Sequence, residues 1–193
     1  MATEQSVDLV DDETVGLFTK AVLLAALTAA LAQISIPLPG PLVPFSLQPF
    51  GMFFAGLLLG PLWGGVALLL YLLVGIAGAP VFSNGNAGIG YVIAGQGSGG
   101  FLVGFLVGAV VAGAIAHRSI APKPVASLSV PVQVVALTAA VAVVYAIGIP
   151  WMSFVTGLPL TRAATVMAPY IPPDLLKLGI AVAVVQGGYL ARR

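Results

Sequence analysis

Residues 21 to 117, a run of 97 residues, contain no lysine, arginine, aspartate or glutamate. Soluble domains carry about 25% charged residues, whereas this chain of 193 residues is 7% charged and 60% hydrophobic. It has too few charges to cover itself with a hydrated surface. Uncharged apolar stretches of this length are typical of helices that cross a lipid bilayer. The sequence therefore predicts an all-α, multi-pass integral membrane protein.

The start of the chain differs in composition from the apolar run. Five of the six acidic residues lie within the first thirteen positions. This segment begins acidic rather than basic, which is not typical of a cleaved signal peptide. We expect residues 1–15 to form a disordered, acidic N-terminal tail and residues 16–193 to form one membrane domain.

Clusters of proline and glycine divide the apolar remainder into separate spans. We expect six transmembrane helices, at about residues 17–34, 47–60, 62–78, 101–116, 130–149 and 174–191. The second span rises only about 21 Å, which is short of the hydrocarbon core of about 30 Å.

The few cations test this helix count, because cytoplasmic loops are enriched in lysine and arginine. With both termini inside the cell, the inner side holds Lys20, Arg118, Lys123, Arg192 and Arg193. The outer side then holds Arg162 alone among the loop cations. This distribution favours six helices with an N-in, C-in topology. The same topology puts the long connections 35–47, 79–100 and 150–173 on the outer face, where we expect a pocket that opens outward.

Asp174 is the only acidic residue after Glu13, and Lys177 follows it by three positions at the start of the last predicted span. This spacing puts both side chains on one helix face. Two interpretations stay open. Asp174 can cap the helix while Lys177 extends to the membrane interface or pairs with it. Alternatively, both residues contact a ligand, because charges retained inside membrane domains usually face a functional cavity.

Other polar and aromatic residues fall on the same predicted outer face. The candidate pocket residues that accompany Asp174 and Lys177 are Gln48, Asn84, Asn86, Tyr91, Gln96, Phe45 and Phe82. A mostly apolar pocket with a few polar anchors is typical of small-molecule sites. An asparagine in a loop is, on its own, most often a turn residue.

Several kinds of activity lack the residues that they need. The chain has no G-x-x-x-x-G-K-[ST] phosphate loop, so we expect no ATPase activity. It has one histidine, His117, and no cysteine, so we expect no metal site, no other cofactor and no enzymatic role. His117 stands next to Arg118, where an interfacial position is expected. No basic stripe points to nucleic acid.

Ala21, Ala25 and Ala29 recur at every fourth position of the first predicted span. Ridges of small residues let two helix backbones approach each other closely. The ridge either packs within the bundle or faces a partner protein, and the sequence leaves both interpretations open.

Residues 34–82 resemble the first half of the BioY family of biotin-transport proteins. The matching positions are Pro37, Pro39, Gly40, Val43, Pro44, Gln48, Gly60, Pro61, Tyr71, Gly75, Gly78, Pro80, Val81 and Phe82. The stretch IPPDLLKLGIAV is similar to the family's Pro-x-Asp-x-x-Lys element, and SGGF is similar to its Thr-Gly-Gly-Tyr element.

The resemblance implies the substrate-binding S-component of an energy-coupling factor (ECF) transporter, a six-helix bundle in the cytoplasmic membrane that captures biotin from outside. It implies as partners a transmembrane coupling protein of the EcfT/BioN type and ATPases of the EcfA/BioM type. The ridge Ala21, Ala25 and Ala29 becomes a candidate docking surface for the coupling protein.

The resemblance also implies that Asp174 and Lys177 contact biotin. Lys177 would meet the valerate carboxylate and Asp174 a ureido N–H, or the two roles are exchanged. Asn84, Asn86 or Gln96 would complete the ureido contacts, and the aromatic residues would hold the ring and chain. The alternatives are an S-component for another carboxylate-bearing vitamin and a structural membrane subunit.

Overall fold

The computed structural model describes residues 11–36, 43–94 and 97–190. Over these ranges, five helical segments are long and apolar enough to cross a membrane. They are α1 (Asp12–Gln33), α2 (Gln48–Ile76), α4 (Gly99–His117), α5 (Val130–Thr156) and the segment Leu160–Gly188. The last segment combines α6 (Leu160–Met167), the 3-10 turn η3 (Ala168–Tyr170) and most of α7 (Ile171–Leu190).

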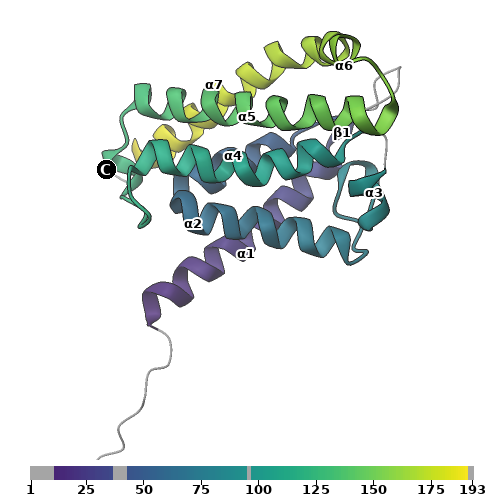
Figure 1. Ribbon diagram of the computed structural model, residues 1–193. Helices are drawn as coiled ribbons and strands as arrows, with labels where there is room; N and C mark the ends of the chain where they lie inside the picture. Colours follow the sequence, from purple (N-terminus) through teal and green to yellow (C-terminus); the bar gives the residue numbers. More distant parts are fainter. Residues whose placement is uncertain (1–10, 37–42, 95–96, 191–193) are drawn as a thin grey trace, which may run out of the picture.

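Short elements connect these helices. Strand β1 (Ser35–Ile36) pairs antiparallel with β2 (Phe45–Ser46), and η1 (Ser83–Gly85) and α3 (Ile89–Ile93) lie between α2 and α4. The turn η2 (Val125–Ser127) precedes α5. Figure 1 shows β1, α3 and α6 together at one end of the helices, opposite the end where the C-terminus lies.

Helix α2 reverses direction in its middle. Gly60 has φ 72° and ψ −172°, which breaks the helical geometry, and Pro61 follows it. A Cβ atom on Gly64 would lie 2.8 Å from the carbonyl oxygen of Ala55, and Gln48 is hydrogen-bonded to Tyr71. A continuous helix would separate these last two residues by about 34 Å. Residues 48–59 and 61–76 are therefore two antiparallel arms, which occupy the positions of the predicted spans 47–60 and 62–78.

His117 holds this reversal against the segment that follows α4. The His117 side chain is fully buried, and its Nε2 lies 3.1 Å from the carbonyl oxygen of Leu57. Its Nδ1 accepts a hydrogen bond of 2.9 Å from the backbone N–H of Lys123. One imidazole thus joins α2 to the 118–124 segment, and the expected interfacial position stays a prediction.

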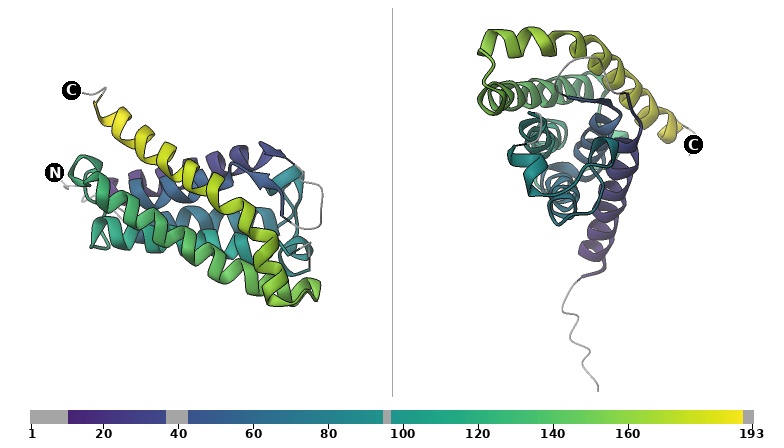
Figure 2. Two further views of the ribbon diagram at one scale, coloured as in Figure 1. Left: turned by 90° about the horizontal axis from the view of Figure 1, so that it is seen from above. Right: turned by 90° about the vertical axis from the view of Figure 1, so that its right-hand side faces the viewer.

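Small residues set the spacing of the central helices. Helix α4 packs against both α2 and α5 and lies between them in Figure 1. A Cβ atom on Gly56 would lie 2.8 Å from the carbonyl oxygen of Ala109, and one on Gly104 would lie 3.0 Å from Cα of Val144. Backbones approach this closely only where side chains are absent or small. Helix α7 crosses the bundle obliquely (Figure 2) and contacts α2 and α5.

Two boundaries differ from those predicted. Asp12 to Val15, assigned to the tail, form the first turn of α1, because Asp11 caps it by accepting from the N–H of Thr14 at 3.3 Å. Residues 1–10 of the predicted tail lie outside the described residues. Helix α5 continues through Pro150 to Thr156, since membrane helices tolerate a proline where neighbouring groups satisfy the freed backbone carbonyl. The predicted loop 150–173 is consequently mostly helical.

Candidate functional site

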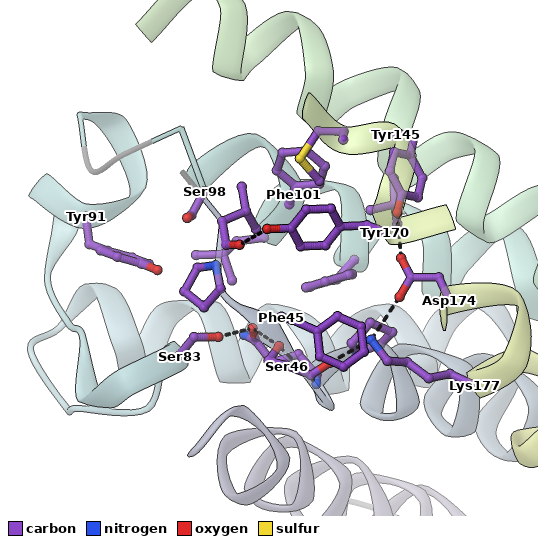
Figure 3. Close-up of a pocket in the computed structure, with 18 residues that line it drawn as sticks. Phe45, Ser46, Ser83, Tyr91, Ser98, Phe101, Tyr145, Tyr170, Asp174 and Lys177 are labelled. Carbon is purple, nitrogen blue, oxygen red and sulfur yellow. Dashed lines mark hydrogen bonds and ion pairs between the residues drawn. The ribbon is translucent and has the colours of Figure 1, made fainter. Parts of the chain in front are cut away.

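A small pocket lies at the end of the bundle that carries β1, α3 and α6 (Figure 3). Its walls come from the chain around β2, the first turn of α2, the segment before α4, and the facing turns of α4, α5, η3 and α7. The cavity measures about 50 Å³, whereas pockets that hold small-molecule ligands usually measure about 300–1,000 Å³.

Lys177 and Asp174 form a buried ion pair in this pocket. Lys177 Nζ lies 2.9 Å from Asp174 Oδ1 and donates a second hydrogen bond, of 2.8 Å, to the carbonyl oxygen of Ser46. The ammonium group also lies 3.9 Å from the centre of the Phe45 ring, where a cation–π attraction adds to its stabilisation. Lys177 is only 5% exposed, so the interpretation that it extends to the membrane interface is wrong.

Two tyrosines complete the surroundings of this pair. Tyr145 on α5 donates a hydrogen bond of 2.7 Å to Asp174 Oδ2, so both carboxylate oxygens of Asp174 accept a hydrogen bond. Tyr170 on η3 donates a hydrogen bond of 2.6 Å to the carbonyl oxygen of Val43. The partners of Asp174 are therefore side chains of the pocket. Tyr170 therefore holds the segment before β2 at the pocket, and Lys177 holds β2 itself through Ser46.

A second group of hydrogen bonds centres on the buried side chain of Gln48. Ser46 Oγ donates to Gln48 Oε1 at 2.9 Å, and Ser83 Oγ donates to the same oxygen. Gln48 Nε2 donates to the hydroxyl of Tyr71, which in turn donates to the carbonyl oxygen of Val81 at 3.1 Å. Gln48, Ser46 and Ser83 line the pocket, and Tyr71 stands behind them.

Aromatic packing supports the wall formed by α3. Tyr91 lines the pocket, and its ring stacks on Phe82 with centroids 5.5 Å apart. Burial raises the pKa of the Tyr91 phenol, although a hydrogen bond with Ser98 acts in the opposite direction. The phenol therefore stays neutral at physiological pH. Phe82 is fully buried and packs between Tyr71 and Tyr91, so it supports the wall from behind.

The structure places five of the predicted pocket residues on the pocket wall and three others off it. Asp174, Lys177, Gln48, Tyr91 and Phe45 all line the pocket. Phe82, Asn84 and Asn86 do not line it. Gln96 lies outside the described residues.

The two asparagines act in the turn around η1. Asn84 has φ 61°, is exposed and is hydrogen-bonded to Ser35. Asn86 donates a hydrogen bond of 2.7 Å to the carbonyl oxygen of Ser83. Asparagine tolerates positive φ and forms such local hydrogen bonds readily, which explains why it occurs here without reaching the pocket.

Sequence reasoning missed several pocket residues, among them Tyr145, Tyr170, Ser46 and Ser83. One signal was available for Tyr145, because a hydroxyl group inside an apolar membrane span needs a polar partner. The two serines gave no such signal, since serine is common in loops for reasons unrelated to ligands.

The predicted docking ridge on α1 is only partly accessible. Ala21 is fully buried, whereas Ala25 and Ala29 are half-buried. Ala25 and Ala29 border an apolar groove between α1 and the second arm of α2, with Leu70 and Val74 on the other side. Ala21 therefore belongs to the interior of the bundle. Elsewhere over the described ranges, no group of three or more His, Cys, Asp or Glu residues could hold a metal ion.

The apolar helices define a multi-pass membrane protein, and the pocket with its balanced ion pair is its candidate functional site. A sequence model of the BioY family matches residues 4–192. The chain therefore belongs to the BioY family.

Named relatives agree with this assignment. The "Biotin transporter BioY" of Rhizobium etli is 32% identical over 84% of this chain and 89% of its own. The "Biotin transporter BioY" of Thermotoga maritima is 36% identical over the same shares. A crystal structure described as "the S-component for biotin from an ECF-type ABC transporter" superposes with a TM-score of 0.83 at 25% identity. That superposition covers 96% of this chain and 95% of the other.

Proposed function

We propose that this protein captures biotin and serves its uptake across the cytoplasmic membrane as the S-component of an ECF transporter. Membership of the BioY family and the superposition on a biotin S-component support the proposal. The observation that carries it in this chain is the ion pair Asp174–Lys177, buried in a pocket with both partners facing the cavity. The protein is a substrate-binding subunit and not itself an enzyme.

The charge balance of the pocket bears on which part of biotin meets the pair. Asp174 already neutralises Lys177 at 2.9 Å, so a carboxylate beside them would bring an unbalanced third charge into a buried site. A ureido group is neutral and places N–H donors next to a C=O acceptor. We therefore propose that Asp174 accepts from a ureido N–H and that Lys177 donates to the ureido oxygen. The valerate carboxylate then extends toward water.

Binding requires side chains around the cavity to move. A cavity of about 50 Å³ is too small for biotin, because ligand pockets start near 300 Å³. Phe45 and Tyr170, whose ring centroids lie 6.4 Å apart, both line this cavity and belong to different segments. We propose that these two rings separate when biotin enters.

Removal of the ammonium group tests the assignment of the site. Lys177→Ala is expected to weaken biotin binding at least tenfold, because the ureido oxygen loses its donor and Asp174 loses its partner. Isothermal titration of detergent-purified protein measures the affinity, and thermal unfolding establishes that the variant is folded. Arg162→Ala is the matched control, since Arg162 is an exposed cation on α6 that does not line the pocket. Equal affinities of a folded Lys177→Ala variant and the wild type would refute the assignment.

Biotin methyl ester separates the ureido assignment from the alternative in which Lys177 meets the carboxylate. If the carboxylate extends toward water, the neutral ester binds within about tenfold of biotin, since it loses no buried ion pair. Competition between the ester and labelled biotin measures the ratio. A loss of more than about a hundredfold would instead assign the carboxylate to Lys177.

We further propose six membrane crossings with both termini in the cytoplasm. The two antiparallel arms of α2 each cross, so its reversal at Gly60 lies on the inner side. A Cβ atom on Gly60 would lie 3.4 Å from Cα of Pro122, which puts the reversal beside the segment that carries Arg118 and Lys123. Lysine and arginine favour the cytoplasmic side, in agreement with this orientation.

The natural chain has no cysteine, so single-cysteine variants can report the topology. A membrane-impermeant maleimide added to intact cells is expected to label Thr161→Cys on α6. Leu62→Cys and Ser119→Cys, both at exposed positions, are expected to react only after the membrane is permeabilised. If Leu62→Cys stays unlabelled in permeabilised cells, α2 does not reverse at the membrane surface and the six-crossing topology is wrong. Labelling of Ser119→Cys in intact cells would reverse the proposed orientation.

For uptake, the protein would work with a transmembrane coupling protein of the EcfT/BioN type and ATPases of the EcfA/BioM type. We propose that the coupling protein docks at the groove beside Ala25 and Ala29, because small side chains there leave room for a close helix contact. Ala21 is excluded from this surface, since it is fully buried.

A bulky side chain in the groove tests docking of the coupling protein independently of biotin binding. Ala25→Trp or Ala29→Trp is expected to abolish co-purification with the coupling protein and biotin uptake, while the affinity for biotin stays within about threefold of the wild type. Val135→Trp, at an exposed position on α5, is the matched control and is expected to keep both. Normal co-purification of the two alanine variants would exclude the groove as the docking surface.

A further inference from the structure

Tyr71 does not line the pocket, yet it is hydrogen-bonded to a residue that does. It lies on the second arm of α2 and is only 3% exposed, and its hydroxyl reaches Gln48 at the start of the first arm. Gln48 reaches both Ser46 and Ser83 on the pocket wall. Tyr71 is therefore connected to the ligand surface through one intermediate side chain.

The directions of these hydrogen bonds follow from the last acceptor in the series. The carbonyl oxygen of Val81 can only accept, so the single hydroxyl proton of Tyr71 points to it. The Tyr71 oxygen must then accept from Gln48, which turns the amide nitrogen of Gln48 toward Tyr71. The amide oxygen of Gln48 consequently faces the two serines, and each serine must donate to it.

This order decides what the serines can offer to a ligand. A serine hydroxyl has one proton and two lone pairs. Ser46 and Ser83 each direct their proton at Gln48 Oε1, so both can only accept from a molecule in the pocket. Ser46 also accepts from the backbone N–H of Gln48 at 3.4 Å, which leaves Ser83 as the main acceptor on this wall.

We propose that Tyr71 is a positioning residue that makes the Ser46–Ser83 wall accept hydrogen bonds only, so that the pocket selects a ligand with an N–H group there. The inference rests on the proposed function, in which the ligand is biotin. One ureido N–H then faces Ser83 while the other faces Asp174. If an oxygen replaces the first N–H, its lone pairs face the lone pairs of the Ser83 hydroxyl. The two oxygens repel each other, and such a ligand binds weakly.

Two cyclic carbamate analogues of biotin test this selectivity, each with one ureido N–H replaced by an oxygen of similar size. The wild type is expected to prefer biotin over the isomer that places oxygen at Ser83 by at least about a hundredfold, because a site built around an N–H rejects its isosteres strongly. In Tyr71→Phe, the Gln48 amide is free to rotate and Ser83 can donate. The preference for biotin over that isomer is expected to fall at least tenfold.

The ratio of the affinities for biotin and for the carbamate isomer distinguishes a loss of ligand selectivity from a loss of packing. A structural defect weakens the binding of biotin and of the carbamate isomer by the same factor. An unchanged ratio of the two affinities in Tyr71→Phe therefore overturns the inference. Thr28→Val, which removes a buried hydroxyl that donates to the carbonyl oxygen of Leu24 within α1, is the matched control and is expected to keep the affinity ratio.

Two further outcomes are decisive. If Tyr71→Phe does not fold, Ser83→Ala is measured in its place; a tenfold fall in the ratio supports the acceptor wall, and an unchanged ratio overturns it. If the wild type binds no biotin, the proposed function fails and the inference fails with it. Biotin binding with an unaltered ratio overturns the inference alone.

Discussion

The buried ammonium group of Lys177 is the constraint on which the arrangement of the helices around the pocket depends. An unpaired charge in an apolar interior costs several kcal/mol, so this group needs partners from whatever segments lie nearby. Its partners are Asp174 on the same helix and the Ser46 carbonyl and Phe45 ring next to it, and Tyr145 holds Asp174 from α5. One charge thereby fixes β2, α5 and α7 relative to one another.

The pocket has two polar walls of different character, which together suit a neutral ligand. The wall on α7 is an ion pair whose charges cancel. The wall behind Ser83 is a series of neutral hydrogen bonds that runs through Gln48 and Tyr71 to the carbonyl oxygen of Val81. Aromatic rings from β2, α3 and η3 complete the lining of the pocket. A ligand that is polar at its centre and apolar around it matches this arrangement better than one whose buried part is charged.

Membrane energetics made much of this fold and site predictable from the sequence. The charge-free run predicts the apolar helices, and the isolation of Asp174 and Lys177 in an apolar helix predicts their place in a pocket, which the structure confirms. Single hydroxyl groups such as Ser83 carry no comparable signal, because their role depends on which distant residue they meet. The helix end predicted at Pro150 is wrong, since a proline inside a membrane helix can kink the helix without ending it. Asn84 and Asn86 were chosen by residue type alone, and turn geometry explains both.

The reversal of α2 has a consequence for the chemistry at the opposite end of the molecule. Gln48 and Tyr71 belong to its two arms, and they meet only because both arms start from the same hinge at Gly60. An insertion or deletion of one residue at that hinge would rotate one arm by about 100° relative to the other. The phenol of Tyr71 would then face lipid or a neighbouring helix. The length of the turn at Gly60, at the far end of the bundle, thus determines whether Gln48 and Tyr71 are aligned to form their hydrogen bond.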